Sequence, residues 1–275
     1  MKKISIITAV YNEEENVREV HETIHALFAS IRGYDYEHIF MDNCSTDRTL
    51  PILKEIAARD KRVKILAYSK NFGPIKTEMI GYQHATGDAV VCFDANLKDP
   101  PELIPIFIKY WEDGYDVVYG VRPKTHDNFL MLRMRKMFYR ICSLLSDEPI
   151  PENAGGFRLV DRKVVNELIK LDDYKPYLRG LIASIGFTQI GVNYTRRARQ
   201  RGKSKSDLRY LFDFAINAFI SYSITPIRLC TYTGIALSAL SSFTAVGYAL
   251  LKIFYPRIQP PGIATVEVHA QENIA

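Results

Sequence analysis

The sequence has few of the residues that build zinc sites, disulfide frameworks and dinucleotide-binding loops. Its cysteines are far apart, with no Cys-x-x-Cys pair and no adjacent histidine cluster: Cys44, Cys92, Cys142 and Cys230. This spacing argues against a structural zinc site or disulfides, and it favours incidental thiols in a reducing compartment. No Gly-x-Gly-x-x-Gly motif follows the first apolar run, which disfavours dinucleotide binding.

The N-terminus lacks the pattern of a secretory signal. Two lysines come first, but the apolar run after them, Ile4–Val10, is only as long as a strand. An acidic cluster, Glu13–Glu15, follows at once, whereas a signal peptide needs a longer apolar core. We therefore expect this end of the chain to stay in the cytoplasm.

The composition is that of an ordinary globular protein, with 47% hydrophobic and 24% charged residues. A length of 275 residues allows one large α/β domain plus an appendage. The net charge of +5 suits a phosphate-rich partner or an anionic membrane, but so small a surplus proves neither. We predict no nucleic-acid partner.

Short apolar runs alternate with amphipathic stretches along most of the chain. Strands are expected at Ile4–Val10, Tyr36–Met41, Val63–Tyr68, Ala89–Phe93, Val117–Tyr119 and Phe187–Tyr194. Helices are expected from an N-cap at Asn12 to about Ser30, from Ser45 to about Ala58, and at Lys76–His84, Glu102–Trp111, Phe129–Leu145 and Asp161–Leu171. This alternation predicts a doubly wound, mostly parallel sheet, which binds ligands at the carboxyl ends of its strands.

Basic residues crowd the segment before the longest apolar run. Seven fall within fourteen residues: Arg196, Arg197, Arg199, Arg201, Lys203, Lys205 and Arg209. An amphipathic stretch, Leu208–Ile224, comes next, and then Leu229–Leu251, which has 23 residues without a formal charge. The last run is long enough to span a bilayer, and its alternative is a buried helix in a large soluble core.

The flanking bases favour the membrane interpretation. We predict a cytoplasmic domain at 1–207, an interfacial amphipathic helix at 208–224, a transmembrane segment at 225–255 and a polar tail at 256–275. For the basic run, attraction to anionic headgroups and a lid over the site are equally compatible with the sequence.

Polar side chains that packing does not need follow three of the predicted strands. They lie in Ala9–Glu13, in Asp42–Asp47 and in Phe93–Glu102, and the turn Asn71–Gly73 stands between the last two. Carboxylates at strand ends can accept hydrogen bonds from a base or ribose, or hold a divalent cation against a diphosphate. Each segment alone could be an ordinary turn, but together they indicate a nucleotide site.

These segments resemble the family-2 glycosyltransferases with a GT-A fold, in the polyprenyl-phosphate (dolichol-phosphate mannose synthase-like) branch. The matching motifs are VYNEEEN, DNCSTDRT, KNFG, ATGDAVVCFDANLKDPPELI, VVYGVR, AGGFRLVDRKVV and RGKSK. The resemblance implies an inverting enzyme that moves a sugar from a UDP- or GDP-sugar to an undecaprenyl- or dolichyl-type phosphate. It places the chain at the inner or plasma membrane, facing the cytoplasm, and is compatible with a homo-oligomer.

The resemblance also implies residue roles. The nucleotide-sugar ligands would be Ala9, Tyr11, Glu13, Asp42, Asn43, Asp94 and Lys98. The catalytic residues would be Asp94, Asn96, Arg122 and Arg133, and Asp94 with Asn96 would hold Mg²⁺ or Mn²⁺. The acceptor phosphate would be bound by Arg122, Arg133, Arg158, Arg201 and Lys205.

Departures from the family pattern concentrate in the same segments. Where this chain has Ala9, Asn43 and Cys44, the family usually has Pro, a second Asp and Gly. Its Asp-x-Asp-x-Gln motif reads Asp94, Asn96, Lys98 here, which raises the local charge by two units and weakens the metal site. Either Lys98 itself neutralises the diphosphate, or the chain only binds nucleotide sugars as a membrane-bound scaffold; the intact acceptor motifs favour the former.

A lipid-phosphate acceptor also suits the chemistry of the motifs. Such a phosphate is already ionised near neutral pH, so no general base is required, and none is obvious around Gly155 and Gly156. A growing polysaccharide would need an additional carboxylate as general base. No such residue is obvious in the sequence, so that acceptor is less favoured. The pair His21 and His25 is expected to be solvated rather than metal-bound.

Overall fold

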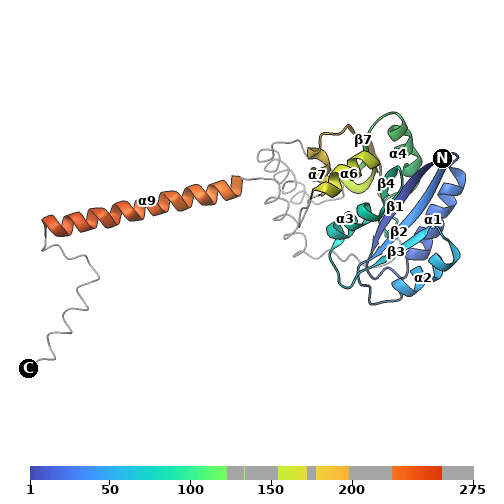
Figure 1. Cartoon of the computed structure of the whole chain (residues 1–275), viewed down its shortest axis with the longest axis horizontal. Coiled ribbons are helices and arrows are strands. Elements are labelled where there is room, and N and C mark those ends of the chain that lie inside the picture. The colour runs from blue at the N-terminus through green and yellow to red at the C-terminus, as the bar shows by residue number, and fades with distance from the viewer. Residues whose placement is uncertain (123–132, 134–153, 172–177, 198–224, 256–275) are drawn as a thin grey trace, which may run out of the picture. The chain divides into compact units, whose positions relative to one another are not determined.

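The structure is a computed structural model that describes residues 1–122, 133, 154–171, 178–197 and 225–255 (Figure 1). The chain divides into two compact units, Met1–Ser223 and Ile224–Ala275. Each unit is described by itself.

A seven-stranded mixed sheet forms the centre of the first unit (Figure 1). Its strands are β1 (Lys2–Val10), β2 (Tyr34–Asp42), β3 (Val63–Ala67), β4 (Ala89–Cys92), β5 (Val117–Val121), β6 (Ala154–Asp161) and β7 (Gln189–Asn193). The order is β3-β2-β1-β4-β6-β5-β7, and β6 runs antiparallel to both of its neighbours. The order reverses between β1 and β4, which is where doubly wound sheets open a ligand crevice.

Helices cover both faces of this sheet. One face packs against α1 (Val17–Ser30), α2 (Thr49–Arg59) and α4 (Leu103–Glu112). The other packs against α3 (Pro74–His84), α6 (Arg162–Lys170) and α7 (Leu178–Ser184). Successive residues of β4 point to opposite cores, as the pleat of a strand requires: Val91 belongs to the first and Val90 to the second.

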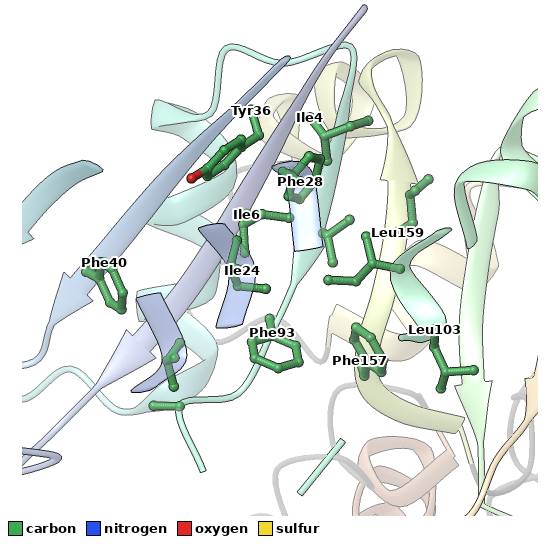
Figure 2. Close-up of a cluster of buried hydrophobic side chains, with 14 of the residues drawn as sticks. Ile4, Ile6, Ile24, Phe28, Tyr36, Phe40, Phe93, Leu103, Phe157 and Leu159 are labelled. Carbon is green, nitrogen blue, oxygen red and sulfur yellow. The ribbon is translucent and has the colours of Figure 1, made fainter. Parts of the chain in front are cut away.

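Aromatic side chains hold Phe93, the residue directly after β4, within the first core (Figure 2). The Phe157 ring on β6 lies 5.5 Å from that of Phe93 and 4.8 Å from that of Phe107 on α4. Such pairs contribute about 0.5–1.5 kcal/mol beyond the area they bury. Because Phe93 immediately precedes Asp94, this packing positions the loop that carries the polar motif.

Within the described residues, the expected strands and helices are confirmed in kind, with three differences. The first helix begins at Val17 with Asn16 as its N-cap, so the cap expected at Asn12 was wrong. Asn12 instead has a φ of 52°, and the backbone N–H groups of Asn16 and Val17 bond to the carbonyl of Glu13. Strand β6 and the short helix α7 were not expected, and the two glycines of β6 lower its strand signal. The helix expected at Phe129–Leu145 and the stretch Leu208–Ile224 lie outside the described residues, Arg133 excepted.

The described part of the second unit is one helix, α9 (Thr225–Phe254). Its segment Cys230–Phe254 has 25 residues and is long and apolar enough to cross a membrane by length and composition. This agrees with the expected apolar span. The division of the remaining C-terminal chain into an interfacial helix and a polar tail stays a prediction.

A histidine lies fully buried in the middle of β2. His38 Nε2 is 3.1 Å from the hydroxyl of Thr8 on β1, and its ring stacks on Phe40 at 3.9 Å. Burial, with a smaller contribution from His21, lowers the pKa of His38 to about 3, although Asp60 acts in the opposite direction. The side chain is therefore neutral in the folded protein throughout the physiological range.

We expect the free energy of unfolding to fall as the pH is lowered from about 7 to about 5. Unfolded His38 takes up a proton near pH 6.5, whereas the folded side chain stays neutral down to about pH 3. The unfolded state then binds more protons, which costs about 2 kcal/mol of stability at pH 5. Chemical denaturation of the full chain in detergent across this range measures the effect.

His38→Gln is the control, since it keeps a polar group for Thr8 but cannot titrate. It should show a flatter pH dependence, with a residual slope from His21, whose pKa burial also lowers. Glu37 does not interfere: against burial, which acts to raise it, hydrogen bonds from Lys64, Ser5 and Thr86 hold its pKa at about 2. Equal slopes for the two proteins would contradict this assignment.

Candidate functional site

The loops after β1, β2 and β4 meet at one edge of the sheet. The carbonyl of Val10 accepts the N–H of Asn43 at 2.9 Å, and that of Ile7 accepts the N–H of Phe93 at 3.0 Å. These three loops also hold each positive φ found at a non-glycine among the described residues: Asn12 (52°), Cys44 (63°) and Leu97 (50°). A left-handed conformation costs roughly 1–2 kcal/mol for such residues and is concentrated at functional sites.

Asn12 ties the first two loops together. Its side-chain oxygen accepts the N–H of Thr46 at 2.7 Å, and its own N–H donates to the Ser45 hydroxyl at 2.9 Å. Glu13, a predicted nucleotide ligand, accepts from the Asn16 amide at 2.5 Å and so also supports the start of α1. Ala9 and Tyr11 lie half-buried at the end of β1 and in the loop after it.

Asp42 and Asn43 are buried at the end of β2. The Asp42 carboxylate accepts the N–H of Ser45 at 3.3 Å, and the Asn43 side-chain oxygen accepts the N–H of Phe72 at 2.8 Å. The side-chain oxygen of Asn43, a predicted nucleotide ligand, therefore holds the Asn71–Gly73 turn in place against the site.

The motif after β4 folds back on itself. Asn96 directs its amide nitrogen toward Asp94 Oδ2, at 3.5 Å, while its oxygen accepts the N–H of Lys98 at 3.0 Å. The Asp94 side chain is 53% exposed, and its Oδ2 lies 3.3 Å from the guanidinium Nη2 of Arg196. Desolvation by the surrounding protein and the nearby Asp99 carboxylate raise the pKa of Asp94, while Arg196 acts to lower it.

Asp99, for which the motifs predicted no role, is the centre of the site. Its side chain is only 1% exposed and accepts hydrogen bonds from three partners on distant segments. Arg122 Nη2, after β5, lies at 3.3 Å; Arg196 Nε, after β7, lies at 3.1 Å; and the Tyr194 hydroxyl also donates. The only signal in the sequence was the Asp-Pro-Pro turn, which cannot identify these partners.

Two glycines allow this network to form. A Cβ on Gly155 would lie 2.9 Å from Arg122 Nη2, and one on Gly120 would lie 2.5 Å from the Tyr194 ring. Arg122 Nε also donates to the Tyr194 hydroxyl at 2.8 Å. Arg122 is thus held beside Asp99, at the edge of the sheet where the polar motif after β4 lies.

Arg158, expected to bind the acceptor phosphate, lies in the second core. Its side chain is 5% exposed, its Nη2 donates to Glu78 on α3, and its Nε donates to the Tyr82 hydroxyl at 3.3 Å. The thiol of Cys92 donates to the same Glu78 carboxylate at 3.0 Å. In this structure Arg158 therefore joins α3 to β6, and its role toward a phosphate stays a prediction.

The other predicted basic ligands are less well defined. Arg133 is described by itself, as an exposed helical residue. Arg201 and Lys205 lie outside the described residues. Their roles stay predictions.

The Mg²⁺ or Mn²⁺ implied by the resemblance does not fit the loop after β4, residues 94–99, well. This loop is called the donor loop below. These ions prefer several hard oxygen ligands, but the loop offers the Asp94 carboxylate, already facing a guanidinium, and an amide that presents its nitrogen. Within the described ranges, one group of three side chains has metal-ligand spacing: His21, His25 and Asp60. His21 and His25 lie on α1 and Asp60 follows α2, and Arg62 Nε is 2.9 Å from the Asp60 carboxylate.

Comparisons with known proteins show which sequences and folds this chain resembles. The family model described as Glycosyl transferase family 2 matches residues 5–169. An uncharacterized glycosyltransferase of Bacillus subtilis, YkcC, is 37% identical over 91% of this chain and 77% of its own length. A bactoprenol glucosyl transferase of Shigella phage SfV is 33% identical over 87% of this chain and 78% of its own length.

One solved structure also shares the fold. It is glucosyl-3-phosphoglycerate synthase from Mycobacterium tuberculosis in complex with Mn²⁺, UDP-glucose and glycerol 3-phosphate. It matches 81% of this chain and 80% of its own, with a TM-score of 0.51 at 20% identity. At that identity the likeness establishes the fold and nothing more.

Asp99→Asn should lower the free energy of unfolding by about 3 kcal/mol, because it leaves two guanidinium groups without their shared buried carboxylate. Glu102→Gln is the matched control. It removes an exposed partner, 3.0 Å from Arg197, and should cost less than about 1 kcal/mol. Denaturation curves of the two variants test the difference, and similar curves would show that Asp99 is not the centre of the network.

Proposed function

This chain belongs to glycosyl transferase family 2, and on that premise we propose that it moves a sugar from a UDP- or GDP-sugar to a polyprenyl phosphate at the cytoplasmic membrane face. The main support is the combination of two features in one chain. Loops that suit a nucleotide diphosphate sit at the sheet's switch point, and an apolar helix of membrane-spanning length follows the same domain. The relatives named bactoprenol glucosyl transferase point to the same acceptor class.

The donor would lie across the ends of β1, β2 and β4. Asp42 and Asn43 are buried there and would face the base and ribose, with Ala9, Tyr11 and Glu13 along the first loop. Asp94 and Lys98 would lie next to the diphosphate. Hydrogen bonds tie the loop after β1 to the loop after β2, and the latter to the Asn71–Gly73 turn. The donor would therefore bind to a surface that is already ordered there.

Charge stabilisation would be the main contribution to the transfer step. A lipid phosphate is already anionic near neutral pH, so it can attack the anomeric carbon in line without a general base. Arg122 lies beside the donor loop, and Arg133, Arg201 and Lys205 are the further proposed phosphate ligands. Such cations lower the barrier by balancing charge that develops on the leaving diphosphate.

The test is to incubate membranes containing the full chain with undecaprenyl phosphate and a panel of radiolabelled UDP- and GDP-sugars. We expect labelled lipid from at least one donor. Arg122→Gln should reduce the rate by about 10²–10³-fold, as loss of one positioned charge donor does. Glu102→Gln, an exposed side chain on the rim, should leave the rate unchanged.

Two other outcomes would contradict the proposal, and each would indicate a different function. A chain that binds a nucleotide sugar but yields no labelled lipid from any donor would be a membrane-bound scaffold. Label transferred to a soluble glycan instead would identify a different acceptor class.

A further inference from the structure

The backbone after β7 is anchored on the donor loop. The N–H of Tyr194 donates to the carbonyl of Val121 at 3.0 Å, and that of Arg197 donates to the carbonyl of Lys98 at 2.8 Å. Arg196 lies between these two contacts. Its place over the motif after β4 is therefore set by the main chain and not by its own side chain alone.

The Arg196 guanidinium joins the two carboxylates of that loop. Nη2 lies 3.3 Å from Asp94 Oδ2 and 3.4 Å from Asp99 Oδ2, and Nε lies 3.1 Å from Asp99 Oδ1. The side chain is 32% exposed, so a solute can reach it. These bonds use Nε and Nη2, and the fork of a guanidinium has further N–H donors on Nη1 for a phosphate oxygen.

The two departures from the family motif, Asn96 and Lys98, change the formal charge of the loop after β4. The ionisable residues of the loop 94–99 are Asp94, Lys98 and Asp99, and Arg122 and Arg196 contact its carboxylates. The formal charges of these five residues sum to +1. With the usual Asp at 96 and Gln at 98 the same group would carry −1. A divalent cation would then be needed to return it to +1.

We propose that this chain holds the donor diphosphate with its own cations, Lys98 and Arg196, in the place that a divalent metal ion would otherwise take. The inference rests on the proposed function, because it requires a nucleotide diphosphate as the donor. The positive charge is then a permanent part of the fold. Arg196, anchored by Asp99, provides the fixed part of it, and Lys98 provides the charge that the family motif lacks.

The experiment measures nucleotide affinity by calorimetry on the purified full chain in detergent. UDP and GDP are the probes, each titrated in excess EDTA and in Mn²⁺. For the nucleotide that binds, we expect the two dissociation constants to agree within about threefold. A dissociation constant that rises tenfold or more in EDTA would overturn the proposal.

Neighbouring arginines supply a matched pair of variants. Arg196→Gln should weaken binding in EDTA by at least about tenfold, as expected for lost charge-assisted hydrogen bonds. Arg197→Gln removes the same charge one residue on, where the side chain forms an exposed pair with Glu102, and should change affinity less than about twofold. Equal effects from both variants would show that Arg196 acts only through general charge.

The converse variant is Asn96→Asp/Lys98→Gln, which changes the net charge of the group to −1. It should bind the nucleotide poorly in EDTA and at least about tenfold more tightly in Mn²⁺. This result decides the matter even if Arg196→Gln unfolds, because residues 96 and 98 are half-buried and belong to neither hydrophobic core. A double variant as indifferent to Mn²⁺ as the wild type would contradict the proposal.

Failure of the proposed function gives a different result. In that case neither UDP nor GDP binds to the wild type under any condition. Metal-dependent binding, by contrast, overturns only the inference about the cations and leaves the transferase proposal standing.

Discussion

The buried carboxylate of Asp99 is the interaction on which the site depends. It lies at the end of the loop after β4 and accepts hydrogen bonds from the ends of β5 and β7. These strands belong to the part of the sheet beyond the antiparallel β6, whereas the loops proposed to bind the nucleotide belong to the parallel part. One carboxylate therefore joins the segments that suit a donor to the segments that carry the cations.

The parallel part of the sheet could be predicted from the sequence because its signals are local. Apolar β-branched runs identify β1 to β4, and polar residues directly after them identify the site edge. Strand β6 could not be identified in this way, since Gly155 and Gly156 lower its strand signal and its pairing partners are distant in sequence. The first helix was placed too early because Asn12 and Asn16 are equally good caps by residue type, and only the left-handed backbone at Asn12 decides between them.

The candidate site was predictable in its acidic loop and not in its basic partners. A run of seven basic residues does not reveal that Arg196 reaches a carboxylate 97 positions earlier. At Arg158 the motif predicted a role but did not reveal the ion pair. Its motif suggested a phosphate ligand, but the Glu78 carboxylate that pairs with it lies on α3, far away in sequence. Long-range pairing of charges depends on topology, which no local pattern contains.

The left-handed residues at Asn12, Cys44 and Leu97 have a consequence for selectivity. A loop held in a sparsely populated backbone conformation by its hydrogen bonds has few alternative shapes of similar energy. Rearranging such a loop around a ligand of a different shape would therefore cost free energy. Discrimination at this edge of the sheet would then come from rejecting misfits by shape, with little entropy lost when the right ligand arrives.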